Sequence, residues 1–168
     1  AQHLLRSKQL GEHTGFLQHP YRWRVAMARL RAAQGDADGA LDLLDEAEHL
    51  YKMDFSPNVR PVAALKTRVW IAQGRLEEAL NWVHEQGLSA GDELGYLREF
   101  EHITVARVLL AQYQSERTEQ TLLAVMRLLE RLLQAAEEGK RTGSVIEILI
   151  LQALSLQMQG VHQAHGNI

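Results

Sequence analysis

Apolar and polar residues recur with a helical period along residues 21–51. In residues 21–34, apolar positions are interspersed with Arg and Ala, both good helix formers, and the spacing predicts a helix. The next segment places one broad apolar face opposite an acidic one. The apolar positions are Ala40, Leu41, Leu43, Leu44, Ala47, Leu50 and Tyr51, and the acidic ones are Asp42, Asp45, Glu46 and Glu48. With Gly35 ending the first helix and Asp36 capping the second, the two form an antiparallel hairpin.

The sequence pattern of this hairpin recurs along the chain. The phrase AAQGDADGALDLL at 32–44 returns as IAQGRLEEALNWV at 71–83, thirty-nine residues later. A weaker third copy, at 109–129, has Tyr113 where the others have glycine, which predicts a longer turn with Ser115 or Thr118 as the cap. A fourth copy begins with a helix at Thr142 that leads to residues 158–160, and its second helix would lie beyond the chain.

Helix pairs that repeat every 35 to 45 residues or so are typical of α-solenoids. The fold class expected is therefore all-α: a right-handed superhelical stack of antiparallel helix pairs of the tetratricopeptide (TPR) kind, with about seven to eight helices. Residues 1–160 are expected to form a single helical-repeat domain, a fragment of a larger protein because the chain starts without Met, and residues 161–168 a frayed tail.

Composition narrows the function classes. Hydrophobic residues make up 46% and charged residues 23%, as in folded proteins, and the formal charge of -3 is spread evenly, so charge alone attracts neither nucleic acid nor a membrane. The absence of cysteine excludes disulfides and thiolate chemistry and fits a cytoplasmic protein. No apolar run is long enough to cross a bilayer.

No catalytic or cofactor motif is present. The chain lacks a phosphate-binding loop, a dinucleotide fingerprint, a zinc-protease motif and a nucleophile elbow, so it is not expected to be an enzyme. His162 and His165 have a spacing that suits a metal, but no third ligand lies near them in sequence, and a frayed tail is the favoured interpretation. No metal site and no cofactor are expected within these residues.

Residues 93–112 mix aromatic and charged side chains into a predicted inner helix. Tyr96, Arg98, Glu99 and Arg107 offer directional hydrogen bonds together with apolar area, as binding surfaces do. The alternative is that Glu99, Glu101 and Arg107 form internal ion pairs that fix the repeat stack. Trp70 and Trp82 face a similar choice, with packing between helices favoured over a ligand platform.

Several of these segments resemble a known family. Residues 58–112, together with 26–51, are similar to the helical-repeat region of the large ATP-binding regulators of the LuxR family, the group that contains the bacterial maltose regulon activator. The elements that carry the likeness are the turn at 28–36, Arg60 with Pro61, the EQGL at 85–88, and the YLREFEHxTxARVLLA run at 96–111.

The resemblance implies a sensor. In that family an N-terminal nucleotide-binding switch, which would hold ATP, precedes the repeats and a helix-turn-helix follows them; this fragment contains neither and should not bind DNA itself. The expected partners are a small-molecule effector or regulatory protein, other domains of the same regulator, and a second copy through self-association. The residues proposed to contact effector or partner are Arg60, Trp82, Tyr96, Arg98, Glu99 and Arg107.

A second function remains open: a TPR-type scaffold that binds a peptide or partner protein and no small molecule. A peptide groove would show a line of Asn, Lys or Arg along the inner helices, whereas an effector site would be a partly apolar cavity. The sequence has no regular basic ladder, which slightly favours the sensor or a domain-docking surface.

Overall fold

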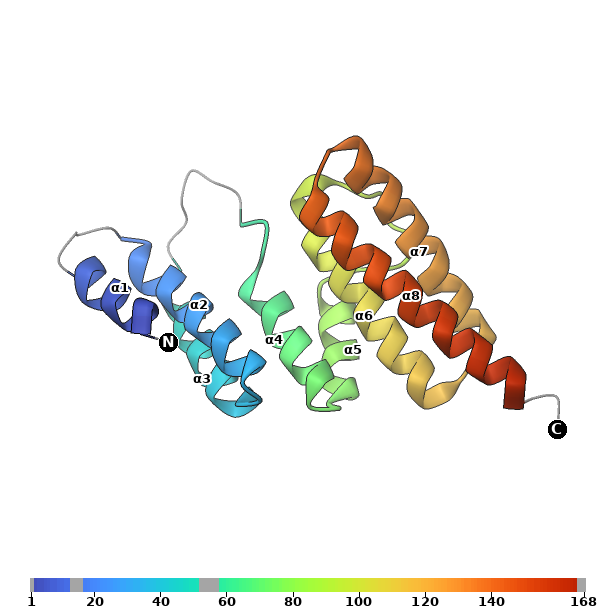
Figure 1. The fold of residues 1–168 in the computed structure, drawn as a ribbon, viewed down its shortest axis with the longest axis horizontal. Coiled ribbons are helices and arrows are strands. Elements are labelled where there is room, and N and C mark those ends of the chain that lie inside the picture. The colour runs from blue at the N-terminus through green and yellow to red at the C-terminus, as the bar shows by residue number, and fades with distance from the viewer. Residues whose placement is uncertain (1, 13–16, 52–57, 166–168) are drawn as a thin grey trace. The chain divides into compact units, whose positions relative to one another are not determined.

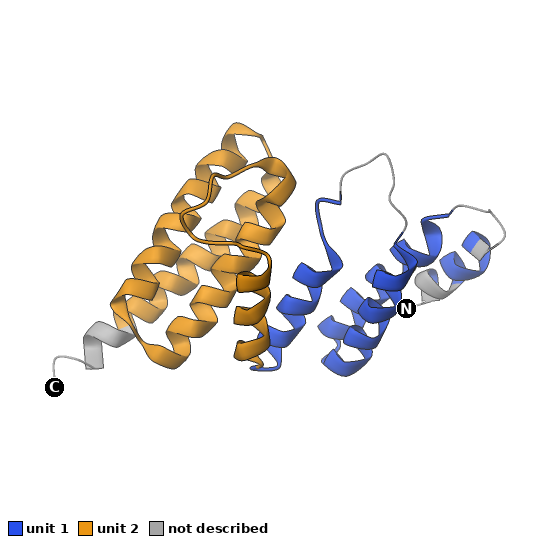
Figure 2. Cartoon of the chain, turned by 180° about the vertical axis from the view of Figure 1, so that it is seen from behind, with its two compact units in different colours: residues 1–74 blue, residues 75–168 orange. Residues whose placement is uncertain are grey.

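A computed structural model describes residues 2–12, 17–51 and 58–165 of the chain. Within them all regular structure is helical, which confirms the all-α, TPR-like prediction (Figure 1). The helices are α1 (Gln2–Glu12), α2 (His19–Ala33), α3 (Ala37–Leu50), α4 (Val62–Ala72), α5 (Leu76–Glu85), α6 (Glu99–Glu116), α7 (Glu119–Glu138) and α8 (Thr142–His165), with a 3₁₀ turn η1 (Tyr96–Arg98) before α6. The chain divides into two compact units, residues 1–74 and 75–168 (Figure 2).

Unit 1 is built around the α2–α3 hairpin. Ala28 on α2 and Ala40 on α3 are both fully buried, and these small side chains allow the two helices to approach closely. Val62 and Val69 bring α4 onto the same core. On the surface the Lys66 ammonium of α4 forms ion pairs with Asp45 and Glu48 of α3. The remaining core residues are Leu44 and Ala47, with Tyr21, Val25, Ala37, Leu41, Leu43 and Leu65 partly buried against them.

The hairpin turn has the predicted local structure. Gly35 adopts a left-handed φ of 84°, a conformation that is unfavourable for residues with a side chain. Asp36 accepts a hydrogen bond from the Gly39 backbone N–H at 3.0 Å and so caps α3. In the second copy Gly74 repeats the left-handed conformation with φ 74°. The boundary between the two units falls directly after it. The repeated phrase therefore encodes a backbone turn.

Unit 2 is organised on α6, which is buried along most of its length. Helices α7 and α8 both pack against α6 and against each other. The core between them consists of Ile103, Val105, Ala106, Val108, Leu110 and Tyr113 from α6; Leu122, Val125, Leu128, Leu129, Leu132 and Ala136 from α7; and Ile148 and Leu151 from α8. Glu99, Glu101, His102 and Thr104 of α6 are buried together with its aliphatic residues, so the sequence of this helix shows no clear division into an apolar and a polar face.

The third turn differs from the prediction. Tyr113 and Ser115 lie inside α6, which continues to Glu116, and the left-handed position is taken by Arg117 with φ 54°. Thr118 occupies the N-cap position of α7, but its hydroxyl bonds to the Thr121 hydroxyl at 2.6 Å and caps no backbone N–H. The helix therefore continues past the buried Tyr113 ring and ends at the left-handed Arg117.

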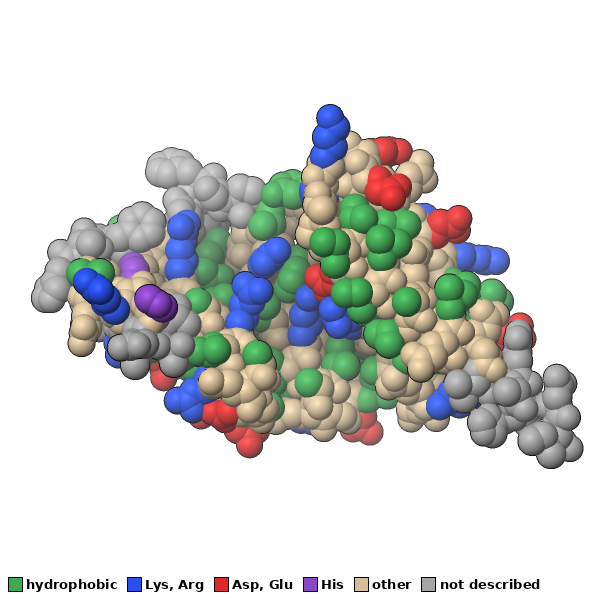
Figure 3. Space-filling view, in the orientation of Figure 1, with side chains coloured by type: hydrophobic (Ala, Val, Ile, Leu, Met, Phe, Trp, Pro, Cys, Tyr) green, Lys and Arg blue, Asp and Glu red, His purple; other side chains and the backbone are tan. Residues whose placement is uncertain are grey.

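Helix α8 buries only one face. Ile148, Leu151 and Ser155 are buried, whereas Ile146, Leu149, Ile150 and Leu154 are each at least 40% exposed. Figure 3 shows hydrophobic side chains gathered over this face of unit 2. Backbone helix continues to His165, into the segment for which the sequence predicts a frayed tail; the side chains of His162 and His165 lie outside the described ones. None of the described helices combines the length and apolarity that a membrane span requires.

Candidate ligand-binding site

Three of the predicted site residues lie close together at the start of α6, and a fourth lies further along the same helix. Tyr96 and Arg98 belong to η1, Glu99 begins α6, and Arg107 lies two turns further along the helix. The Arg98 guanidinium donates to the Glu101 carboxylate at 3.2 Å and to the Gln86 carbonyl at 3.3 Å. Arg98 thus ties the loop after α5 to the first turn of α6.

Glu99 lies at the centre of a polar cluster. The residue is buried, and its carboxylate accepts hydrogen bonds from Arg141 Nε at 2.6 Å and from Ser144 Oγ at 2.6 Å. The same Arg141 guanidinium lies over the Tyr96 ring at 5.6 Å and donates to the Ala135 carbonyl at the end of α7. An ion pair and a hydrogen bond therefore hold the start of α6 against the turn between α7 and α8.

Arg107 makes a second link to α8. Its Nε and Nη2 donate to the same Glu147 oxygen at 3.0 Å and 2.8 Å. The internal ion pairs that the sequence offered as an alternative are thus present at Glu99, Glu101 and Arg107. Whether these residues also contact an effector stays a prediction, and Tyr96, at 58% exposed, is the most accessible of the group.

Trp82, on α5, is buried. Its side chain is 4% exposed, and its indole Nε1 has no hydrogen-bond partner among the described residues. Trp70 on α4 is only partly buried. The placement of Trp82 matches the packing interpretation offered from sequence, and a ligand would reach its ring only after the surrounding helices moved.

A loop of unit 2 holds one strongly shifted carboxylate. The Ser89 hydroxyl and backbone N–H both donate to Asp92, at 2.6 Å and 2.9 Å, and the buried His102 ring contacts the same carboxylate at 3.2 Å. These hydrogen bonds lower the pKa of Asp92 to about 2. Arg131 of α7 donates to the Ala90 and Asp92 carbonyls, so this loop is fastened on both sides.

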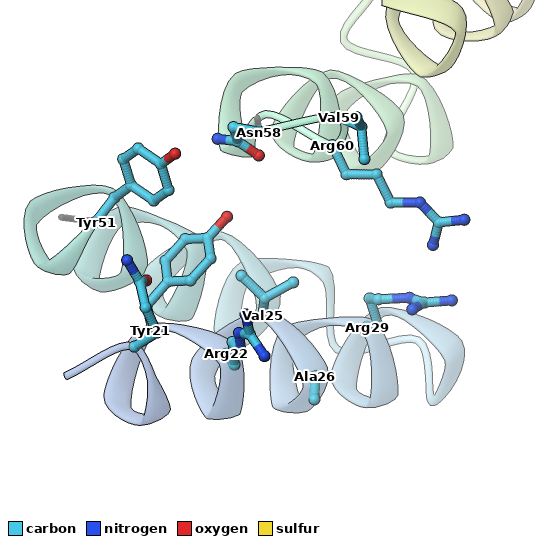
Figure 4. A pocket seen from close by; sticks show the side chains of 10 residues that line it. Tyr21, Arg22, Val25, Ala26, Arg29, Tyr51, Asn58, Val59 and Arg60 are labelled. Atoms are coloured by element: carbon cyan, nitrogen blue, oxygen red, sulfur yellow. The ribbon is translucent and has the colours of Figure 1, made fainter. Parts of the chain in front are cut away.

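The sixth predicted residue, Arg60, lines an open pocket within unit 1. The pocket has a volume of about 320 Å³ and lies between α2, the end of α3 and the segment 58–60 that precedes α4 (Figure 4). This volume is at the lower end of the range of small-molecule sites, roughly 300–1,000 Å³. Its lining consists of Gln18, Tyr21, Arg22, Val25, Ala26, Arg29, Tyr51, Asn58, Val59 and Arg60.

One face of α2, together with its N-cap Gln18, supplies more than half of this lining. The residues are 18, 21, 22, 25, 26 and 29, a spacing of three and four that places them in one stripe along the helix. The sequence pattern of this segment predicts only a helix with an apolar face, rich in Arg and Ala. The signal that marks the site is the presence of Arg22 and Arg29, seven positions apart, in the same stripe as Tyr21 and Val25.

Two tyrosines form the aromatic end of the pocket. The rings of Tyr21 and Tyr51 meet edge to face, with centroids 5.1 Å apart and an interplanar angle of 62°. Burial and the neighbouring Tyr51 raise the pKa of Tyr21 above its usual value, while a hydrogen bond with the Asn58 side chain opposes that shift. The Tyr21 phenol is therefore neutral at physiological pH, and the two tyrosines present hydroxyl groups and ring edges to the pocket (Figure 4).

The opposite end of the pocket is cationic. Figure 4 shows the Arg29 and Arg60 guanidinium groups at the far end of the view from the two rings. Arg22, which lies beside Tyr21 in Figure 4, is a third arginine of the lining, and the described lining residues include no Asp or Glu. Within the described residues, Arg29 has no carboxylate partner, whereas its neighbour Arg24 pairs with Glu46 at 2.6 Å outside the pocket. The Arg29 and Arg60 guanidinium groups give this end of the pocket a positive charge (Figure 4).

A comparison with known protein families agrees with the helical-repeat fold. A family model described as the MalT-like TPR region matches residues 1–166. No curated protein and no solved structure gives a match. In the described part of the chain, no group of three or more His, Cys, Asp or Glu side chains is placed to hold a metal ion.

Proposed function

The chain belongs to the family of the MalT-like TPR region, and on this premise we propose that it senses an effector for a bacterial ATP-dependent transcriptional regulator of the LuxR family. The observation that carries the proposal is the pocket of about 320 Å³ in unit 1, with aromatic and cationic groups at opposite ends. A pocket with an apolar wall and a few directional polar groups is typical of small-molecule sites.

The mechanism we propose is a shift between two arrangements of the helical repeats. The pocket is formed by α2, the end of α3 and the segment before α4, so a bound effector would contact three consecutive elements of the array. A ligand that binds one arrangement better raises the population of that arrangement by its difference in affinity. An ATP-binding switch domain and a DNA-binding domain elsewhere in the regulator would respond to this change.

Calorimetric titration of this chain with sugars, acyl metabolites and aromatic compounds tests the proposal. We expect saturable binding of at least one class, and an effect of that compound on transcription by the full-length regulator. A well-folded chain that binds none of them contradicts the sensing role.

A second candidate function is a scaffold for a protein partner, and the exposed face of α8 favours it. Ile146, Leu149, Ile150 and Leu154 are spaced three and four apart, the pattern by which an amphipathic helix packs against another. The partner proposed is an amphipathic helix from another domain of the same regulator. Leu149→Glu would then disrupt signalling in the full-length regulator while leaving small-molecule binding at the pocket unchanged.

A further inference from the structure

We infer that the unit 1 pocket selects an organic anion, specifically a small molecule with a flat apolar body and one phosphate or carboxylate group. This inference deepens the proposed function by naming the ligand class. It follows from the arrangement of Tyr21 and Tyr51 at one end of the pocket and Arg29 and Arg60 at the other.

The cationic end determines the charge of the ligand. Guanidinium groups bind phosphate and carboxylate through paired, charge-assisted hydrogen bonds, which are about twice as strong as neutral ones. Arg29 comes from α2 and Arg60 from the segment before α4, so an anion held between them would be bound from both sides of the pocket. The described lining residues include no carboxylate, so they offer a cationic ligand no countercharge.

The aromatic end determines the shape of the ligand. The edge-to-face contact of Tyr21 and Tyr51 presents ring surface to the pocket, and Val25 and Val59 extend the apolar wall. Planar groups pack well on such surfaces, whereas an inorganic ion would leave them exposed to water. The Asn58 amide and the tyrosine hydroxyls supply polar contacts near the rings.

The polarity of the site distinguishes this ligand class from a neutral sugar. A sugar needs many hydroxyl partners with both donors and acceptors, and carboxylates often supply the acceptors. Guanidinium groups only donate, so this end of the pocket is complementary to a group that only accepts. An ionised phosphate or carboxylate has that character.

Three probes separate the contributions of charge and shape. Phenyl phosphate carries both features, inorganic phosphate only the charge, and benzyl alcohol only the ring. We expect phenyl phosphate to bind the chain about tenfold or more tightly than either of the others, as measured by calorimetry. Amide shifts in a nitrogen-15 spectrum should map to residues 18–29 and 58–60. Equal binding of benzyl alcohol, or shifts confined to other residues, would overturn the inference.

Matched arginine variants test the location. Arg29→Gln and Arg60→Gln should each weaken phenyl phosphate binding about tenfold, whereas Arg24→Gln should change it by less than about twofold. Arg24 is the control because it lies on the same helix and pairs with Glu46 outside the pocket. Arg29 is exposed, so its replacement should leave the melting temperature unchanged. An equal loss in Arg24→Gln would show nonspecific attraction and refute the site.

A ring variant tests the aromatic end. Tyr51→Leu should weaken phenyl phosphate and leave the weak binding of inorganic phosphate unchanged; a change in neither would refute the aromatic contact. If phenyl phosphate binds here but no organic anion alters transcription by the full-length regulator, the ligand class stands and the sensing role fails. If the regulator responds only to neutral effectors and phenyl phosphate does not bind, sensing stands and this inference fails.

Discussion

Arg141 Nε donates to the Glu99 carboxylate at 2.6 Å, although the two residues are 42 positions apart in sequence. Their side chains are 24% and 10% exposed, so the pair is partly withdrawn from water. Because the protein has displaced most of the water around the Glu99 carboxylate, its negative charge is stabilised mainly by the Arg141 guanidinium.

Removing the charge of Glu99 should therefore destabilise unit 2. Glu99→Gln keeps the shape of the side chain but weakens the bonds from Arg141 and Ser144, and we expect the free energy of unfolding to fall by about 1–2 kcal/mol. Urea denaturation followed by circular dichroism measures this. The control is Glu78→Gln at the exposed pair with Arg75, where the loss should be clearly smaller because solvent screens the pair. Equal losses would mean that the Glu99 pair contributes no more than a surface pair.

The Asp92 carboxylate should make the stability of unit 2 depend on acid pH. Its folded-state pKa of about 2 lies below the ordinary value of about 3.9, so the unfolded chain takes up the proton first. The stabilisation is fully present above about pH 4 and is lost as the pH falls towards 2 or so. The difference in unfolding free energy between the native chain and Asp92→Asn should therefore shrink over this interval.

Ser89→Ala provides the matching test from the donor side. It removes the hydroxyl bond to Asp92 while keeping the carboxylate, so part of the same pH-dependent stabilisation should disappear. Both variants are measured by thermal unfolding at pH values on either side of the interval. A difference between native chain and Asp92→Asn that does not change with pH would contradict the assignment.

The Gly35 turn should tolerate a methyl group poorly for reasons of conformation alone. No atom lies within 4 Å of a Cβ built at this position, so no clash arises, but the φ of 84° is unfavourable for any L side chain. We expect Gly35→Ala to lower the unfolding free energy by about 1 kcal/mol, and Gly35→Asn by less, because Asn tolerates the left-handed region better.

Gly143 is the matched comparison for that substitution. It lies in the first turn of α8, also with open space around its Cβ, but without a positive φ. Gly143→Ala should raise the unfolding free energy by up to about 0.5–1 kcal/mol, since alanine favours helix. Changes of the same sign at both positions would show that the backbone conformation is not the cause.

The Arg107–Glu147 pair is suited to a double-mutant cycle. Arg107→Glu and Glu147→Arg should each destabilise the chain, and the double variant should recover a coupling energy of about 0.5–1 kcal/mol, as expected for a partly exposed pair. Thermal or urea unfolding of the four proteins measures it. Strictly additive effects would show that Arg107 is not fixed by Glu147 and would leave it available as a ligand contact.

The sequence was informative where local rules decide the structure. The turn at Gly35 and the cap at Asp36 follow from a residue that accepts positive φ and a short side chain that accepts a hydrogen bond. The third turn was misplaced because Arg117 adopts the same conformation without a glycine to mark it. A left-handed non-glycine residue depends on its surroundings, which the sequence does not display.

The candidate site was less predictable for a different reason. The pocket joins residues of α2 to residues about thirty positions further along, and contact between Tyr21 and Tyr51 depends on how the hairpin packs. The family resemblance singled out Arg60, and the arginines of α2 appeared only as helix formers. By contrast, Glu99 and Arg107 stood out in sequence and have partners inside unit 2, at Arg141 and Glu147.

The two copies of the hairpin turn share their glycine but not their cap. Asp36 accepts a bond from the first turn of α3, whereas Arg75 stands in the same place before α5 with no side-chain cap, since a guanidinium has no acceptor to offer. The first turn is therefore an internal template for protein engineering. The substitution Arg75→Asp places the same aspartate before α5. It removes an exposed ion pair with Glu78 and adds an N-cap that contributes about 1 kcal/mol to stability. A stabilising residue for one repeat can thus be chosen from the corresponding position of another repeat in the same chain.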